Sequence, residues 1–108
     1  MSERKKIYIS GKITGDKNAE AKFRAAESFL IKTGYDPINP FKIPVHRSIS
    51  SPRWIDYLKA DLLEMLKHNC EKIYLLHDWN YSDGAKVEVC LAEKFEYEII
   101  RQKHSFNG

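Results

Sequence analysis

Short apolar runs recur along the chain, with longer segments of helical spacing between them. Each run is rich in β-branched and aromatic side chains and is bounded by glycine or polar residues, which is typical of buried strands. We therefore predict strands at residues 7–9, 35–39, 72–76 and 97–100. Pro37 lacks the N–H group that a sheet hydrogen bond needs, so we expect the second strand at an edge of the sheet.

The first two segments between strands predict amphipathic helices, because their apolar residues recur at three- and four-residue intervals. The first helix is expected to end before Gly34, since glycine commonly stops a helix at that position. The second follows a loop at residues 40–52 and begins with Ser51 as its N-cap and Pro52 in its first turn. The two apolar stripes consist of Phe23, Ala26, Phe29 and Leu30, and of Trp54, Ile55, Leu58, Leu62, Met65 and Leu66.

A third helix is predicted from about Asp83 to Glu96, and residues 101–108 are expected to form a mobile tail. Alternating strands and helices favour a three-layer α/β/α, Rossmann-like (flavodoxin-like) fold with a parallel sheet of about four strands. Right-handed crossovers, with the proline-bearing strand at one edge, give the order 2-1-3-4. We expect a single domain over residues 1–108, with its core at about residues 6–100.

Ligands of such a sheet bind beyond the carboxyl ends of its strands, at the point where the strand order reverses. Three loops are expected to meet there, at residues 10–17, 39–53 and 77–84. We therefore expect the functional site at this edge of the sheet.

Composition narrows the classes of function. The 108 residues include 43% hydrophobic and 31% charged residues, which is typical of a globular domain. The net charge is +3, but basic and acidic side chains nearly balance over residues 7–100, so the excess lies at the two ends. Since no basic stripe is interleaved with aromatic residues, a polynucleotide partner is disfavoured. No apolar run is long enough to span a membrane and no leader peptide is visible, so we expect a cytoplasmic protein.

Histidine and cysteine give no sign of a metal site. The four histidines show no ligand spacing, and the two cysteines suggest neither a disulfide framework nor a nucleophilic pair. We expect reduced cysteines and no metal or other cofactor. The residues concerned are His46, His68, His77, His104, Cys70 and Cys90.

The third helix carries a carboxylate on its apolar side. With Leu91 as the reference and 100° per residue, Glu88 lies at about 60°, between Gly84 at about 20° and Ala92 at about 100°. A buried carboxylate is costly unless it opens into a cavity, and the first turns of a helix favour an anion. Two interpretations stay open: Glu88 faces a ligand, with Gly84 leaving room for it, or Glu88 bends outward to solvent or to a lysine.

Asp61 is a weaker candidate at the border of the second helix's apolar stripe, about 60° from Leu58. Alone, it is best interpreted as an ordinary boundary residue. Together with Glu88, it makes a pair of carboxylates of the kind that divides nucleophile and acid roles at an anomeric carbon.

The loop Ser10-Gly11-Lys12-Ile13-Thr14-Gly15 offers backbone N–H groups to a phosphate, although a plain turn explains its glycines as well. It matches neither a Walker A loop nor a dinucleotide-binding fingerprint. Ser82 is a candidate N-cap for the third helix, and its hydroxyl could equally meet a phosphate. Trp79 could stack on a base, but packing is the simpler interpretation.

Three motifs occur in order along the chain: Tyr8-Ile9-Ser10-Gly11-Lys12-Ile13-Thr14-Gly15, Asp61-Leu62 and Ser82-x-Gly84-x-x-x-Glu88. Over about residues 6–100 the chain resembles the nucleoside 2-deoxyribosyltransferase superfamily, and in particular its 2′-deoxynucleoside 5′-monophosphate N-hydrolases. Small bacterial and phage domains of the superfamily are similar at Tyr35-Asp36-Pro37-x-Asn39-Pro40 and Trp79-x-x-Ser82-x-Gly84-Ala85. The chain departs from the transferases at Cys70-Glu71, where they usually have an Ala-Asp pair, and its first loop is less basic than that of the nucleotide hydrolases.

The resemblance implies that Glu88 attacks C1′ of a deoxyribosyl group and forms a covalent glycosyl-enzyme, which water or a second base then resolves. It implies that Asp61 assists base departure or holds the sugar, and that Tyr8 orients Glu88. The loop from Gly11 to Gly15, with Ser82, would hold a 5′-phosphate. The substrate-binding residues expected on this basis are Ser10, Gly11, Lys12, Gly15, Asn39, Trp79, Ser82 and Gly84. Homodimers in which a neighbour completes the pocket are common in the family, so we expect one here.

Three functions remain in order of preference. The first is an N-glycosidase or base-exchange transferase acting on a deoxynucleoside or its 5′-monophosphate. The second is a non-catalytic module that binds or senses a small nucleotide-like ligand. The third is an interaction domain whose surface alone matters. A buried carboxylate at Glu88 favours the first, because a sensor does not need one.

Overall fold

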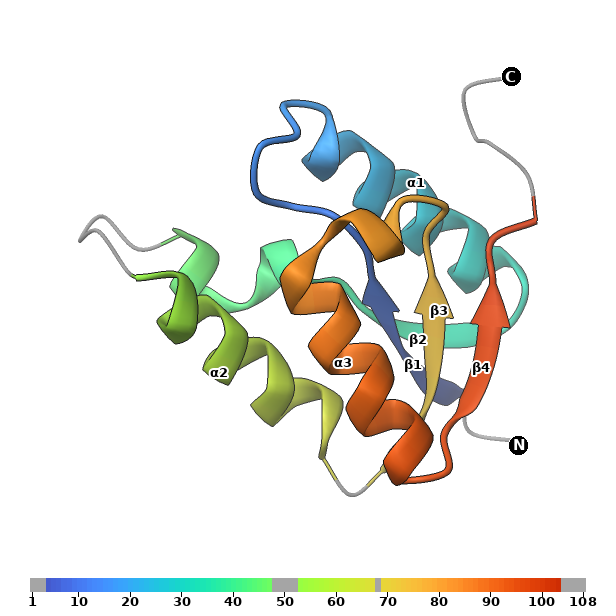
Figure 1. Ribbon diagram of the computed structural model, residues 1–108. Helices are drawn as coiled ribbons and strands as arrows, with labels where there is room; N and C mark the ends of the chain where they lie inside the picture. Colours follow the sequence, from blue (N-terminus) through green and yellow to red (C-terminus); the bar gives the residue numbers. More distant parts are fainter. Residues whose placement is uncertain (1–3, 48–52, 68, 104–108) are drawn as a thin grey trace.

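The computed structural model describes residues 4–47, 53–67 and 69–103, which form a four-stranded parallel sheet flanked by helices (Figure 1). The strand order is β2-β1-β3-β4, so the predicted α/β fold and strand order are confirmed. The strands are β1 (Lys5–Ser10), β2 (Tyr35–Ile38), β3 (Cys70–Leu75) and β4 (Glu98–Arg101), and the helices are α1 (Ala19–Lys32), α2 (Trp54–Met65) and α3 (Asp83–Lys94).

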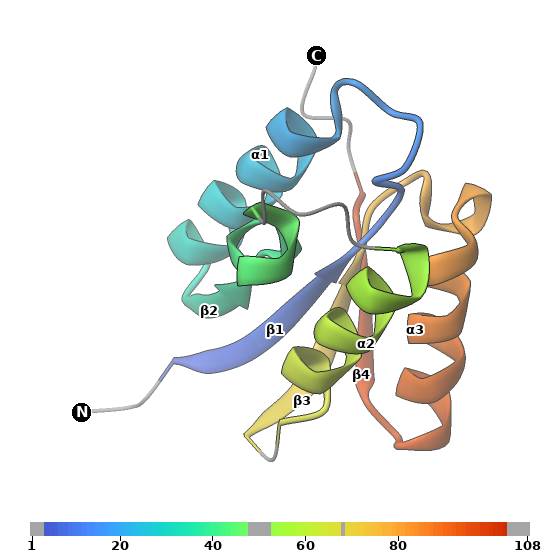
Figure 2. The same ribbon diagram turned by 90° about the vertical axis from the view of Figure 1, so that its left-hand side faces the viewer.

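The molecule has three layers. Helix α1 covers one face of the sheet, and α2 and α3 lie side by side on the other (Figure 1, Figure 2). Strand β1 serves both faces, because successive side chains of a strand point to opposite sides. Ile7 and Ile9 pack with Phe23 of α1, whereas Tyr8 belongs to the hydrophobic cluster on the α3 side. The same alternation turns Ser10, two residues after Tyr8, toward α3.

Two predictions for the segment after α1 are confirmed: the helix ends before Gly34, and the strand with Pro37 lies at an edge of the sheet. Gly34 lies two residues beyond the end of the helix and has a φ of 101°, which glycine adopts without strain. Pro37 lies in β2, at one edge of the sheet, opposite Ile7 of β1. A proline is tolerated there because one side of an edge strand has no neighbouring strand.

The predicted loop at residues 40–52 is more ordered than the sequence pattern indicates. Its described part contains two 3₁₀ turns, η1 (Pro40–Lys42) and η2 (Pro44–Arg47). Asn39 opens the first of them, because its side-chain oxygen accepts a hydrogen bond from the Phe41 N–H at 3.0 Å. A third short turn, η3 (Trp79–Tyr81), lies in the polar loop after β3.

The start of α2 is known from Arg53 onward. The predicted N-cap Ser51 and first-turn Pro52 lie outside the described residues. Helix α2 begins at Trp54 with Arg53 as its N-cap residue, so it begins later than the prediction of Ser51 as N-cap requires. The Arg53 N–H donates a hydrogen bond to the Asp56 carboxylate at 2.9 Å. This bond satisfies one backbone donor at the helix start.

The predicted apolar stripes are wider than the faces that are buried. Phe29 of α1 is 42% exposed and Trp54 of α2 is 48% exposed. In α3, the buried face is turned away from Leu91, the reference residue of the wheel, which is only partly buried. The helix buries Ala85, Val89 and Ala92 and exposes Val87 and Phe95, because its small residues allow the backbone to approach the sheet closely. Glu88 lies within this small-residue face, as the wheel predicted.

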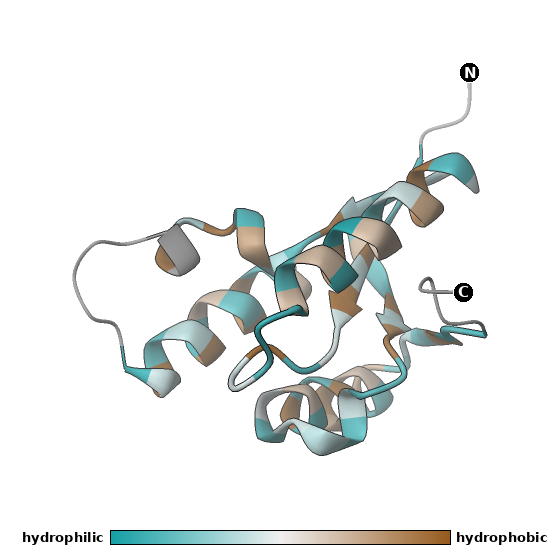
Figure 3. Cartoon of the chain, turned by 90° about the horizontal axis from the view of Figure 1, so that it is seen from above, coloured by the Kyte–Doolittle hydropathy of each residue, from teal (hydrophilic) through white to brown (hydrophobic). Residues whose placement is uncertain are grey.

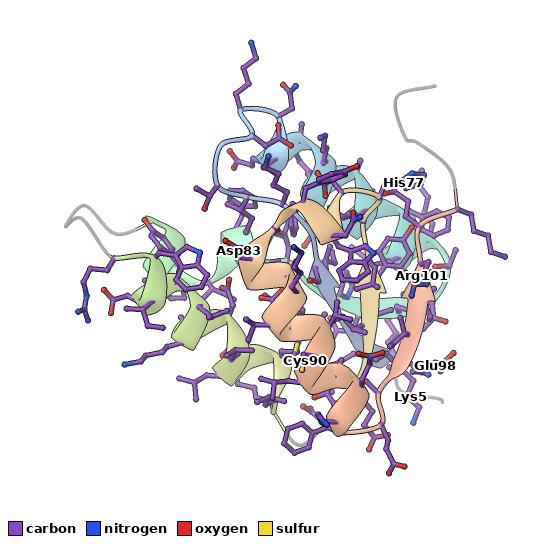
Figure 4. All side chains as sticks on the ribbon, viewed as in Figure 1. Lys5, His77, Asp83, Cys90, Glu98 and Arg101 are labelled. Atoms are coloured by element: carbon purple, nitrogen blue, oxygen red, sulfur yellow. The ribbon has the colours of Figure 1, made fainter. Side chains whose placement is uncertain are left out.

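Hydrophobic and hydrophilic residues both occur on every helix, as the view from above shows (Figure 3). This is the pattern of helices that cover a sheet with one face. None of the helices in the described ranges has the length and apolar character that a bilayer crossing requires. Both cysteines are free thiols: Cys70 is buried, and Cys90 is exposed on α3 (Figure 4).

Candidate active site

A cavity of about 300 Å³ lies at the carboxyl ends of the strands, beside β1. The three loops expected at this edge all contribute to it, together with α2 and α3. Its position agrees with the rule that ligands bind where the strand order reverses, which here is at β1. The lining consists of Tyr8, Ile9, Gly11, Ile13, Thr14, Phe23, Pro40, Phe41, Trp54, Tyr57, Leu58, Asp61, Ser82, Gly84, Ala85 and Glu88.

Glu88 lies on the buried face of α3, lines this cavity and is only 5% exposed. Both of its carboxylate oxygens accept hydrogen bonds from hydroxyl groups of β1. Tyr8 Oη donates to Oε2 at 2.7 Å, and Ser10 Oγ donates to Oε1 at 2.7 Å. These bonds fix the orientation of the carboxylate, so Glu88 faces the cavity and does not bend outward.

Burial dominates the protonation of Glu88. Removal from water raises its pKa from 4.5 to about 8, because burial penalises the charged form. The hydrogen bonds from Ser10 and Tyr8 act in the opposite direction, and the negative charge of Asp61 raises the pKa further. The pKa of Tyr8 is also raised well above its usual value, first by burial and then by Glu88 and Asp61. The Tyr8 phenol therefore stays a hydrogen-bond donor.

Asp61 lines the same cavity from α2 and is 5% exposed. Asp61 and Glu88 are thus two buried carboxyl groups on neighbouring helices that share one cavity. Like charges close together oppose each other's ionisation, which is why Asp61 raises the pKa of Glu88. Two carboxyl groups that share one cavity are the arrangement that acid–base or nucleophilic chemistry at one centre uses.

Aromatic side chains form much of the remaining wall. Phe23 comes from α1, Phe41 from η1, and Trp54 and Tyr57 from α2. The rings of Phe23 and Phe41 meet edge to face, with their centroids 5.4 Å apart. A flat heteroaromatic group fits a wall of this composition, because stacked and edge-to-face contacts between rings are favourable.

Two candidates from the third motif also reach the cavity. Ser82 is the N-cap of α3, as predicted: its Oγ accepts a hydrogen bond from the Ala85 N–H at 3.1 Å. Gly84 lies in the first turn, where a Cβ would point toward Leu58, Ser82 and Trp54 at 3.9–4.0 Å. A side chain at Gly84 would therefore take up cavity space without a clash.

The first loop is only partly in the cavity. Gly11 lines it and packs so closely on Leu76 that a Cβ would lie 2.7 Å from the Leu76 side chain. Lys12 lies in an adjoining hollow, and Gly15 lies in the exposed turn that follows, with a φ of 81°. Ser10 does not line the cavity, but its hydroxyl donates a hydrogen bond to Glu88, which does.

Two further candidates lie outside the cavity lining. Asn39 is buried and caps η1 through its bond to the Phe41 N–H. Trp79 packs against the core on the α3 side, and the Arg101 guanidinium lies 5.8 Å from the centre of its ring. The simpler interpretation of Trp79 as a packing residue agrees with this position.

Sequence reasoning did not select the aromatic wall. Trp54, Tyr57, Leu58 and Asp61 follow the i, i+3, i+4, i+7 spacing of one helix face. That spacing could have assigned Tyr57 to the face that carries Asp61. Phe41 follows a proline in a segment without periodicity, so no pattern in the sequence could place it.

No group of three or more potential metal ligands comes together in the described ranges. Residues 5–101 match the model of a protein family described as a domain of unknown function, DUF4406. No curated protein matches the chain.

Proposed function

The chain belongs to the DUF4406 family, a domain of unknown function, and from the geometry of its cavity we propose that it is an N-glycosidase or base-exchange transferase. Its substrate is a deoxynucleoside or a deoxynucleoside 5′-monophosphate. The observation that carries the proposal is Glu88, a buried carboxylate that lines a cavity and is oriented by two hydroxyl groups. A purely structural acid would not need this combination of burial, cavity and fixed orientation.

Glu88 is the nucleophile of the reaction. An ionised carboxylate oxygen attacks C1′ of the deoxyribosyl group, the C1′–N bond breaks, and its electron pair leaves with the base, which takes up a proton. The product is a covalent glycosyl ester on Glu88. A water molecule that attacks C1′ releases deoxyribose, or deoxyribose 5-phosphate from a monophosphate. Alternatively, a nitrogen of a second base attacks C1′ and forms a new nucleoside or nucleotide; in either case Glu88 is regenerated.

Tyr8 and Ser10 position the nucleophile and stabilise its charged form. Each donates a 2.7 Å hydrogen bond to one carboxylate oxygen, and such bonds favour the ionised state. Asp61, on α2, has a different role: it holds the sugar or assists the departure of the base. The aromatic wall made by Phe41, Trp54 and Tyr57 receives the base.

The proposal includes a second copy of the chain, seated on the face formed by α2 and α3. Six of the nine large hydrophobic side chains exposed in the described ranges belong to these two helices or to the residues that cap them. Leu63 is 72% exposed and Phe95 is 60% exposed. Half-exposed Trp54 lines the cavity as well, so a neighbour on this face would also close the cavity.

Light scattering on a sizing column tests the dimer. We expect the wild type to elute at twice the monomer mass and Leu63→Asp at the monomer mass. Ile31→Asp is the matched control, because Ile31 is an exposed hydrophobic residue on α1, across the sheet. A wild type of monomer mass would refute this part of the proposal.

A non-catalytic binding module is the second candidate. It is favoured by the high pKa of Glu88, because a carboxyl that is largely protonated near neutral pH is a weak nucleophile until it ionises. A neutral carboxyl can instead donate a hydrogen bond to a ligand. The two functions differ in one observable, the release of free base.

The test incubates pure protein with each of the four common 2′-deoxynucleosides and their 5′-monophosphates and measures free base by liquid chromatography. We expect release from at least one substrate, and a mass increase of one deoxyribosyl group, or one deoxyribosyl 5-phosphate group from a monophosphate, on the peptide that carries Glu88. Glu88→Gln should abolish both signals.

Glu93→Gln is the matched control, since Glu93 is an exposed glutamate on the same helix. It should release base at the wild-type rate. If no substrate releases base but calorimetry detects binding, the binding module replaces the enzyme. If Glu88→Gln keeps the wild-type rate, Glu88 is not the nucleophile.

A further inference from the structure

Asp78 is a partly buried aspartate near the cavity, and the proposed reaction does not use its carboxylate. It precedes η3 in the loop after β3, and its side chain is 21% exposed. Its Oδ1 accepts a hydrogen bond from the backbone N–H of Lys12 at 3.1 Å. Lys12 directly follows Gly11, which lines the cavity. Asp78 therefore takes up a backbone donor of the loop that was expected to hold a phosphate.

Two N–H groups that directly follow this loop, before α1, are also engaged within the protein. The Asp16 N–H donates to the Ile13 carbonyl oxygen at 3.3 Å, and the Asn18 N–H donates to the Asp16 carboxylate at 2.9 Å. Phosphate-binding loops work by pointing several backbone N–H groups at the anion. Here the Lys12 N–H within the loop and the Asp16 and Asn18 N–H groups after it already have acceptors, and two of those three acceptors are carboxylates.

Lys22, a cation of α1 near this loop, pairs with the same two carboxylates. Lys22 of α1 lies 2.8 Å from Asp16 and 3.5 Å from Asp78. The hydrogen bond from Lys22 lowers the pKa of Asp16, and the same bond raises the pKa of Lys22, so the pair stays charged. The charge of Lys22 is therefore directed at Asp16 and Asp78 and is not available to a ligand.

The hollow that adjoins the cavity is balanced in charge. It shares Thr14, Trp54 and Ser82 with the cavity, and the charged residues in its lining are Lys12 and Asp83. Asp83 lies at the start of α3, at the end of the helix near the carboxyl ends of the strands (Figure 4). A phosphate in this hollow would meet one cation and one anion, and the backbone N–H of that cation's residue, Lys12, is already bonded to the Asp78 carboxylate.

We propose that Asp78 is a specificity-determining residue that excludes anionic groups from the first loop, so that the cavity takes uncharged nucleosides in preference to their 5′-monophosphates. The proposal rests on the proposed function and narrows its substrate class. Asp78 acts in two ways: its carboxylate occupies the Lys12 N–H, and its negative charge repels a phosphate that approaches the loop.

The test compares each 2′-deoxynucleoside with its own 5′-monophosphate. Dissociation constants are measured by calorimetry on the Glu88→Gln background, in which turnover is removed, and kcat/KM is measured on proteins with Glu88. We expect the nucleoside to be favoured at least tenfold in the presence of Asp78. Asp78→Asn keeps an oxygen that can accept from the Lys12 N–H but removes the charge, and it should shift the ratio at least tenfold toward the monophosphate.

Asp36→Asn is the matched control, because it removes the same charge from an exposed aspartate of β2 that pairs with Lys6 at 3.0 Å, away from the cavity. It should leave the ratio unchanged. Lys22→Met should move the ratio the other way, further toward the nucleoside. This second variant decides the matter if a thermal melt shows that Asp78→Asn does not fold.

The outcomes separate the two proposals. Base release without a preference for the nucleoside, or a ratio that Asp78→Asn leaves unchanged, overturns the role of Asp78 and leaves the enzyme standing. Selective binding of the nucleoside without base release overturns the enzyme and keeps the role of Asp78. A protein that binds neither ligand overturns both.

Discussion

Glu88→Gln should stabilise the protein, and the gain should grow with pH. Glutamine has the shape of a protonated glutamate and cannot ionise. Its amide can accept a hydrogen bond from one hydroxyl and donate one to the other, and the Tyr8 and Ser10 hydroxyls can act in either sense. The substitution therefore keeps the contacts at Glu88 and removes only the cost of a buried charge.

The size of the effect follows from linkage between protonation and folding. The pKa of Glu88 is about 8 in the folded protein, against 4.5 in the absence of burial. A carboxyl whose pKa is raised by folding contributes stability that is complete below the unfolded pKa and is lost as the pH rises toward the folded pKa. Wild-type protein should therefore lose about 0.2 kcal/mol at pH 4, about 2 kcal/mol at pH 6 and about 4 kcal/mol at pH 8 relative to a neutral side chain.

Urea unfolding at pH 4, 6 and 8 measures this difference. The free energy of unfolding of Glu88→Gln should match that of the wild type at pH 4 and exceed it by several kcal/mol at pH 8, a large share of the ~5–15 kcal/mol of a typical domain. Glu93→Gln should follow the wild type at all three pH values. If the curves of Glu88→Gln and wild type stay parallel from pH 4 to 8, then Glu88 does not carry a raised pKa and the argument from burial fails.

Three further predictions concern the same residues. The value of kcat/KM for base release should rise with pH up to about 8, because Glu88 of the free enzyme must ionise before it reacts; a flat profile from pH 6 to 9 would contradict the role of Glu88 as nucleophile. Tyr8→Phe removes one hydrogen bond to the carboxylate, worth about 1.5–3 kcal/mol, and should move that pH limb upward by about one to two units, whereas an unshifted limb would show that Tyr8 does not tune Glu88. Gly11→Ala places a Cβ 2.7 Å from the Leu76 side chain and should lower the free energy of unfolding by about 1–3 kcal/mol, as urea denaturation would measure; a neutral result would mean that Leu76 moves aside freely.

Short patterns in the sequence were enough to predict most of the fold. The β-branched runs, the glycine after α1 and the proline of β2 are each interpretable within a few residues, and all three lie where they were expected. The chirality of crossovers then restricts the strand order, so the topology follows from few observations. The two 3₁₀ turns between β2 and α2 escaped prediction, because such short turns have no periodicity, and the first of them begins with a single hydrogen bond that Asn39 accepts from the Phe41 N–H.

Helix faces were harder to predict than helices. The wheel of α3 used Leu91 as its reference, and Leu91 is only partly buried. The packed face is made by Ala85, Val89 and Ala92, whose small side chains let the helix lie close to the sheet. Glu88 lies on the wheel next to Ala92, which belongs to this packed face. The prediction for Glu88 therefore did not depend on the residue chosen as the reference.

The family resemblance, and not periodicity, named Tyr8 as a partner of Glu88, and it placed Ser10 only among the substrate-binding residues; strand alternation explains why both side chains meet Glu88. Tyr8 and Ser10 are two residues apart, and a period of two fixes their common side without knowledge of any neighbour. The side to which they point is decided by the sheet, which places α3 opposite them. Asp78 had no such signal: its role depends on a backbone N–H 66 residues away, and only the folded loop brings the two together. Residues whose chemistry is carried by periodic elements are thus accessible from sequence, whereas those that act on loop backbone are found only in the structure.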